Sequence, residues 1–124
     1  MSKSILYLLI IGFFSCTISK VELKSISVLD LQNKLKNENS IMVIDVRTES
    51  EFDGPLGHIA NSKLKPLSNI SQTIMDLKSI GDKPVYVVCR SGNRSTTATM
   101  KLRTEGINAI NVEGGMKAWN KIIK

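Results

Sequence analysis

The sequence predicts a small α/β domain with a mostly parallel sheet and helices on both faces. Strand-like and helix-like patterns alternate along the chain after residue 20, as they do in βαβ units. The run "IMVIDV" at 41–46 is almost continuously apolar, which is typical of a strand covered on both faces. A length of 124 residues suits one domain, and a composition of 42% hydrophobic and 23% charged residues is that of an ordinary globular protein.

The first twenty residues are set apart from this pattern and predict a secretory signal. Lys3 supplies a positive start, an apolar run covers 5–14, and small polar residues follow. This run is short for a bilayer span, and a buried first helix is the alternative. We therefore expect a signal peptide at 1–20 and one domain at 21–124, exported to the periplasm or cell envelope.

Cys16 leaves two routes of signal cleavage open. The stretch "FFSC" resembles a relaxed bacterial lipobox, in which Cys16 would carry a lipid anchor, whereas an ordinary cut after Thr17 or Ser19 would remove it. Either route leaves Cys89 as the single free thiol of the mature domain. A lone cysteine in an oxidising compartment closes no internal disulfide, so it is either reactive or inert and buried.

The elements expected in the first half follow from periodicity and caps. "KSISV" is typical of a short strand, and leucines at helical spacing predict a helix that ends at Asn37. After the strand at 41–46, the capping box from Thr48 to Glu51 predicts a short helix, which "DGPLG" ends.

The second half continues the alternation. Apolar residues at helical spacing predict a helix over 70–80, and "VYVV" at 85–88 is a second buried strand. We expect the next helix at 93–105 with Gly106 as its left-handed cap, a strand in "INAINV", and a last helix in "GGMKAWNKII" that buries Trp119, Ile122 and Ile123.

The carboxyl end of the strand at 85–88 is the expected site, because ligands in open α/β sheets bind beyond the carboxyl ends of strands. Cys89 comes directly after this strand, and a reactive cysteine needs its thiolate stabilised. The following helix points its positive end at the loop, Gly92 lets successive amides turn inward, and Arg90 and Arg94 add positive charge.

Four motifs in order resemble rhodanese-type sulfurtransferases, of the single-domain exported thiosulfate type. They are "IDVRTESEF", "GHIAN", "VVCRSGNRS" and "VEGGMKAW", and the likeness extends from about Lys24 to Ile122. The resemblance implies a five-stranded α/β domain that needs no cofactor, in which Cys89 accepts a sulfane sulfur as a persulfide and passes it on. The chain departs from the family's commoner form at Ala60 and Asn61, which replace a usual Pro-Gly.

The loop after Cys89 is expected to hold a small anionic sulfur donor such as thiosulfate. Its amides would bind the donor and the persulfide, with a thiol, cyanide or a protein as acceptor. Arg90 matches the family's arginine after the cysteine. Arg94 stands where other members carry a small hydroxyl residue, so it either contacts substrate or points outward and neutralises the helix face. The expected substrate-binding residues are Arg90, Ser91, Gly92, Asn93, Arg94 and Ser95.

Supporting roles are expected for three other polar residues. Asp45 and Arg47 form a structural pair beneath the site, because buried polar groups at a strand end need partners. His58 is the only histidine and fixes its loop; with no cysteine or carboxylate cluster beside it, we expect no metal site. The net charge of +6 comes from scattered lysines, so we expect no nucleic-acid partner.

Three other functions compete with this interpretation. Cys89 could be an inert buried thiol, or the domain could be a binding module or persulfide carrier that does not turn over. A cysteine phosphatase or arsenate reductase would place its arginine six residues after the cysteine, where this chain has Ser95. A phosphatase also needs an acid for the leaving group, and the loop carries none.

Overall fold

The structure is a computed structural model that describes residue 12 and residues 20–124. The predicted signal segment, with Cys16, lies almost entirely outside the described residues. Within the described part of the chain, no helix has the length and apolar character needed to cross a membrane.

Five parallel strands form a single sheet, as predicted. Its order across the sheet is β1 (Ser25–Ile26), β5 (Ala109–Val112), β4 (Val85–Val88), β2 (Met42–Asp45) and β3 (Lys63–Leu64). Strand β4 pairs with β5 on one edge and β2 on the other, and all four of its residues are buried because they alternate between the cores on the two faces of the sheet. A continuous apolar run is therefore the sequence that this position requires.

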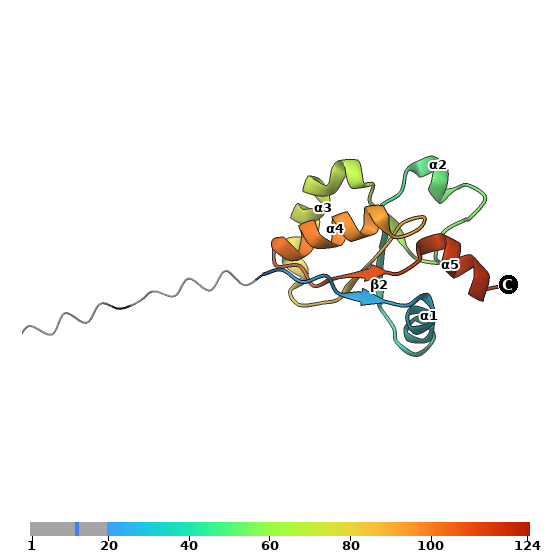
Figure 1. Cartoon of the computed structure of the whole chain (residues 1–124), viewed down its shortest axis with the longest axis horizontal. Coiled ribbons are helices and arrows are strands. Elements are labelled where there is room, and N and C mark those ends of the chain that lie inside the picture. The colour runs from blue at the N-terminus through green and yellow to red at the C-terminus, as the bar shows by residue number, and fades with distance from the viewer. Residues whose placement is uncertain (1–11, 13–19) are drawn as a thin grey trace, which may run out of the picture.

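Helices cover both faces of the sheet (Figure 1). On one face α1 (Val28–Asn37) and α5 (Gly115–Ile122) pack on Val43, Tyr86 and Val88. On the other, α3 (Ile70–Leu77) and α4 (Asn93–Thr104) pack on alternate residues of the same strands. The remaining helices are short: α2 (Glu49–Phe52), η1 (Leu67–Asn69) and η2 (Lys78–Ile80).

Local signals set several helix ends. Thr48 caps α2 in a capping box, in which its hydroxyl accepts from the Glu51 amide and the Glu51 side chain accepts from the Thr48 amide. Gly106 follows α4 in the left-handed region at φ 82°, as expected of a helix stop. The predicted helix over 70–80 is confirmed as α3 continued by η2.

Three details differ from the expectations. Val28 begins α1 rather than ending β1, because the Ser27 hydroxyl accepts the Asp30 amide at 3.1 Å and starts the helix there. Strand β3 has only two residues, too few to show a period. Ile123 is 51% exposed, since α5 ends one residue before it.

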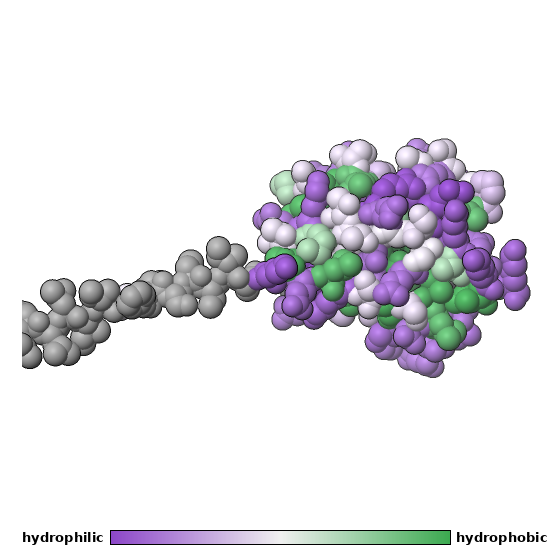
Figure 2. Space-filling view, viewed as in Figure 1, coloured by the Kyte–Doolittle hydropathy of each residue, from purple (hydrophilic) through white to green (hydrophobic). Residues whose placement is uncertain are grey.

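The molecular face in Figure 2 is largely hydrophilic, with apolar groups scattered between the polar ones. This distribution agrees with the scattered lysines of the sequence.

Candidate active site

Cys89 follows the central strand and is buried against the start of α4. Its side chain is within 3.2 Å of the Ser95 hydroxyl, and the Gly92 amide donates to its sulfur at 3.1 Å. The residue is 1% exposed, so the sulfur lies at the base of the loop rather than on the surface.

The loop from 90 to 95 turns back over the sulfur at Gly92. This residue has φ 116° and is the N-cap of α4, a conformation that side chains with a Cβ rarely adopt. The turn directs the Gly92 amide at the sulfur and brings the amino end of the 12-residue α4 beside it. Asn93 is the first residue of the helix, so the positive end of its dipole lies next to Cys89.

The loop lowers the pKa of the Cys89 thiol below its ordinary value. Burial alone would raise the pKa, because it disfavours the charged form. Hydrogen bonds from the Ser95 hydroxyl and from the amides of Ser95, Gly92 and Ser91 outweigh this effect by stabilising the thiolate. The loop thus directs the Gly92 amide and the Ser95 hydroxyl at the sulfur.

Helix α5 holds the backbone of the cysteine loop from the side. The Met116 amide donates to the Cys89 carbonyl at 2.8 Å, and the Lys117 amide donates to the Arg90 carbonyl at 3.0 Å. Gly115 makes this approach possible: a Cβ there would lie 2.7 Å from the Arg90 carbonyl group and closer still to the Cys89 oxygen. This contact explains the second glycine of the "VEGGMKAW" motif, and a Cβ on the first, Gly114, would lie 2.6 Å from the Ala118 Cβ.

Arg94 binds a carboxylate of the protein itself. Its two terminal nitrogens donate to the two Glu51 oxygens at 2.6 and 2.7 Å, which ties the start of α4 to α2. This pair lowers the pKa of Glu51 to about 2, chiefly through the hydrogen bonds from Arg94. The geometry gives Arg94 a role in holding the loop. Of the two roles that the sequence left open, this is closer to an outward Arg94 that neutralises the helix face than to a substrate contact.

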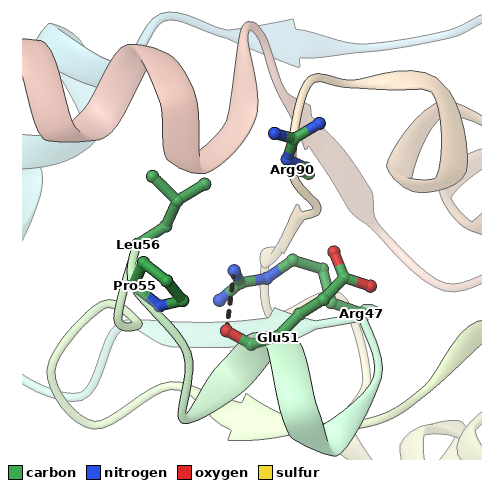
Figure 3. A pocket seen from close by; sticks show the side chains of 5 residues that line it. All are labelled: Arg47, Glu51, Pro55, Leu56 and Arg90. Atoms are coloured by element: carbon green, nitrogen blue, oxygen red, sulfur yellow. Dashed lines mark hydrogen bonds between the residues drawn. The ribbon is translucent and has the colours of Figure 1, made fainter.

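A cavity of about 220 Å³ opens beside the loop. Figure 3 shows Pro55 and Leu56 along one wall, Arg47 and Glu51 below, and Arg90 facing them from the loop after β4. Arg90 is exposed, and its charge lies where an anion entering the cavity would meet it.

Asp45 and Arg47 form a fully buried ion pair at the end of β2. The Arg47 guanidinium donates to the Asp45 carboxylate with a shortest distance of 2.7 Å, and also to the carbonyls of Glu51 and Gly57. These bonds join β2, α2 and the cavity wall, so Arg47 positions the wall as well as lining it.

The loop that carries His58 is fixed by local contacts. The His58 ring stacks on Phe52 with centroids 3.6 Å apart, and its Nδ1 lies 2.9 Å from the Phe52 carbonyl. Asn120 of α5 donates to the Leu56 carbonyl at 3.0 Å. Asn61, in the Ala60-Asn61 departure, adopts φ 64°, a conformation that asparagine tolerates better than most residues.

Some residues of the site escaped the sequence analysis. Asn111 of β5 accepts a hydrogen bond from Ser95 at 2.6 Å, and it lies one residue before the "VEGGMKAW" motif, in none of the four motifs. Glu51 was noted as a cap but not as the partner of Arg94. Among residues 20–124, no group of three or more histidine, cysteine or acidic residues is placed to hold a metal ion.

Comparison with known proteins agrees with this geometry. Residues 27–122 match the family described as "Rhodanese-like domain". The chain belongs to this family. Of two Bacillus subtilis relatives, "Uncharacterized protein YqhL" is 41% identical over 66% of this chain and 63% of its own length. "Putative sulfurtransferase YtwF" is 31% identical over 80% of this chain and 92% of its own.

Solved structures of this rhodanese-like family have the same fold. A rhodanese-like domain protein from Staphylococcus aureus is 38% identical, with a TM-score of 0.71 over 78% of this chain and 91% of its own. The five-stranded parallel sheet with helices on both faces is thus the family's architecture.

Proposed function

We propose that this chain is a sulfurtransferase that carries sulfane sulfur as a persulfide on Cys89. The observation that supports this most is the sulfur at the base of an amide cradle, with its pKa lowered by those amides and by Ser95. The relative "Putative sulfurtransferase YtwF" supports the same chemistry by its name.

The proposed reaction needs no proton donor. The Cys89 thiolate attacks the outer sulfur of thiosulfate, a new S–S bond forms, and the S–S bond of the donor breaks as sulfite leaves with the electron pair. A thiol or cyanide then attacks the outer sulfur of the persulfide and restores the thiolate. Loop amides and Arg90 stabilise the negative charge during both steps.

The carboxylates near the loop argue against phosphate-ester hydrolysis. That reaction requires a protonated acid for the leaving oxygen. Glu51, with a pKa of about 2, is ionised at neutral pH, and Asp45 is buried against Arg47. Both groups therefore act as partners of arginines.

The test is to find the added sulfur. The full chain with Cys16→Ser, in which Cys89 is the only thiol, is incubated with thiosulfate, and its intact mass is measured. We expect one added sulfur atom, which is absent from Cys16→Ser/Cys89→Ser and removed by cyanide with formation of thiocyanate. An absent adduct, or an equal one without Cys89, would contradict the proposal.

Arg90 and turnover give a second readout of the same proposal. In Arg90→Ala we expect a higher KM for thiosulfate, because this charge lines the cavity. Lys101→Ala, on the exposed part of α4, is the matched control and should leave the KM unchanged. An adduct that forms without turnover would instead support a persulfide carrier that serves one partner protein.

Export is a separate proposal that depends on the signal-like segment. We propose that residues 1–20 direct the chain to the cell envelope, with Cys16 as a lipid anchor. Labelling of growing cells with a radioactive fatty acid tests this, with Cys16→Ser as control. Label on both chains, or on neither, would exclude the anchor.

A further inference from the structure

The Ser95 hydroxyl has one proton and three neighbouring acceptors. Its oxygen is 2.6 Å from Asn111 Oδ1, 3.0 Å from the Gly92 carbonyl and 3.2 Å from the Cys89 sulfur. A hydroxyl donates only one hydrogen bond, so these acceptors cannot all receive it at once. Ser95 and Asn111 are both buried, which leaves little solvent to supply another donor.

The Asn111 amide is oriented to accept. Its Nδ2 faces the Ser25 hydroxyl at 3.5 Å, and Oδ1 is thereby directed at Ser95. The contact of 2.6 Å is the shortest of the three around the hydroxyl, so Ser95 donates to Asn111 when the sulfur is a neutral thiol. The thiol then donates its own proton to the Ser95 oxygen.

We propose that Asn111 is a positioning residue that competes with the Cys89 sulfur for the hydroxyl proton of Ser95. When Cys89 ionises, the hydroxyl must turn from Asn111 to the sulfur to stabilise the thiolate. When the sulfur becomes a persulfide, the negative charge moves to the outer sulfur, and the hydroxyl returns to Asn111. The last step rests on the proposed function, whereas the competition itself needs only the thiol.

Other charges around the sulfur are spread over several elements and stay in place when Asn111 is changed. Arg94 of α4 is bound to Glu51 of α2, and Asp45 is bound to Arg47 at the end of β2. Two further cations near the loop are Arg90, which follows Cys89, and Lys117 of α5, whose amide donates to the Arg90 carbonyl; Glu113 precedes Gly114, which lies against Gly92. Replacing Asn111 therefore changes which acceptor receives the Ser95 hydroxyl proton, and it changes no formal charge.

The experiment measures ionisation of Cys89 in the full chain with Cys16→Ser. Thiolate absorbance is titrated against pH, with the same chain carrying Cys89→Ser as the blank, and the rate of iodoacetamide alkylation at pH 7 is measured. Asn111→Leu removes the acceptor and keeps the branching of the side chain. We expect its alkylation rate to rise about threefold, as a pKa lower by half a unit would give. Ser95→Ala removes the donor, and its rate should fall about tenfold, as for one unit.

The combined variant Ser95→Ala/Asn111→Leu separates this role from a merely structural one. If Asn111 acts through the Ser95 proton, the combined variant matches Ser95→Ala alone. Asn108→Leu, near the start of β5 with its amide on the Asp82 carbonyl, is the control and should match the parent. Asn111→Val replaces Asn111→Leu if the latter does not fold.

A fall in the rate of Asn111→Leu would overturn the proposal, since it would mean that the amide donates to Ser95. An alkylation rate in Asn111→Leu equal to that of the parent would overturn it as well. So would a rate increase of the same size when Asn111→Leu is added to Ser95→Ala. Because no sulfur donor is present, the result is independent of whether Cys89 forms a persulfide.

Discussion

Gly115 is the position where one methyl group should damage both the fold and the site. Its φ is 56°, and an added Cβ would lie 2.7 Å from the carbonyl carbon and oxygen of Arg90, which are backbone atoms. The left-handed conformation costs a non-glycine residue roughly 1–2 kcal/mol. Forcing extra volume into a packed region typically costs about 1–3 kcal/mol more.

Gly106→Ala is the control that separates the two costs. This glycine also has a positive φ, of 82°, but a Cβ there meets nothing within 4 Å. Its replacement should therefore lower the free energy of unfolding only by the conformational cost of about 1–2 kcal/mol. We expect Gly115→Ala to be less stable than Gly106→Ala by about 2 kcal/mol.

Urea unfolding of the two variants measures this difference, and alkylation of Cys89 gives a second readout. Moving the Cys89 carbonyl shifts the sulfur away from the Gly92 amide, so Gly115→Ala should also lower the alkylation rate at pH 7. Equal stabilities for the two variants, or a rate that Gly106→Ala lowers just as much, would refute the reasoning.

Two further predictions concern the ion pairs of the site. Asp45→Asn leaves Arg47 buried without its counter-charge and should lower the free energy of unfolding in urea by on the order of 3 kcal/mol. The control Asp76→Asn, in an exposed pair, should lower it by less than about 1 kcal/mol. Equal losses of stability in the two variants would contradict the argument. Because the folded pKa of Glu51, about 2, is below its ordinary 4.5, its stabilisation is complete above pH 4.5 and is lost as the pH falls through 2. The stability gap between the wild type and Glu51→Gln should therefore narrow from pH 7 to pH 3, and a constant gap would show that Glu51 is not held this way.

Sequence patterns predicted the elements that carry their own signal. The apolar runs of β2 and β4 reflect burial on both faces, and the capping box from Thr48 to Glu51 gives α2 although it has only four residues. Strand β3 has no comparable signal, because its two residues become a strand only by pairing with Ile44 and Asp45 of β2. Its existence was implied by the family resemblance alone.

The residues of the candidate site also differ in whether a local sequence pattern predicts them. The turn at Gly92 and the helix start at Asn93 are local, so the sequence around Cys89 predicts the cradle. The partner of Arg94 is 43 residues away, and the contact between Asn111 and Ser95 spans 16. Such pairs depend on how strands and helices pack, which a local pattern does not determine.

The central position of β4 affects which parts of the sheet open first. With neighbours on both edges, its backbone amides should exchange with solvent only when the whole domain opens. The two-residue outer strands β1 and β3 can fray at a lower cost in free energy. Destabilising the outer strand β3 should therefore speed amide exchange at that edge of the sheet and leave the exchange of the β4 amides, next to Cys89, much less affected.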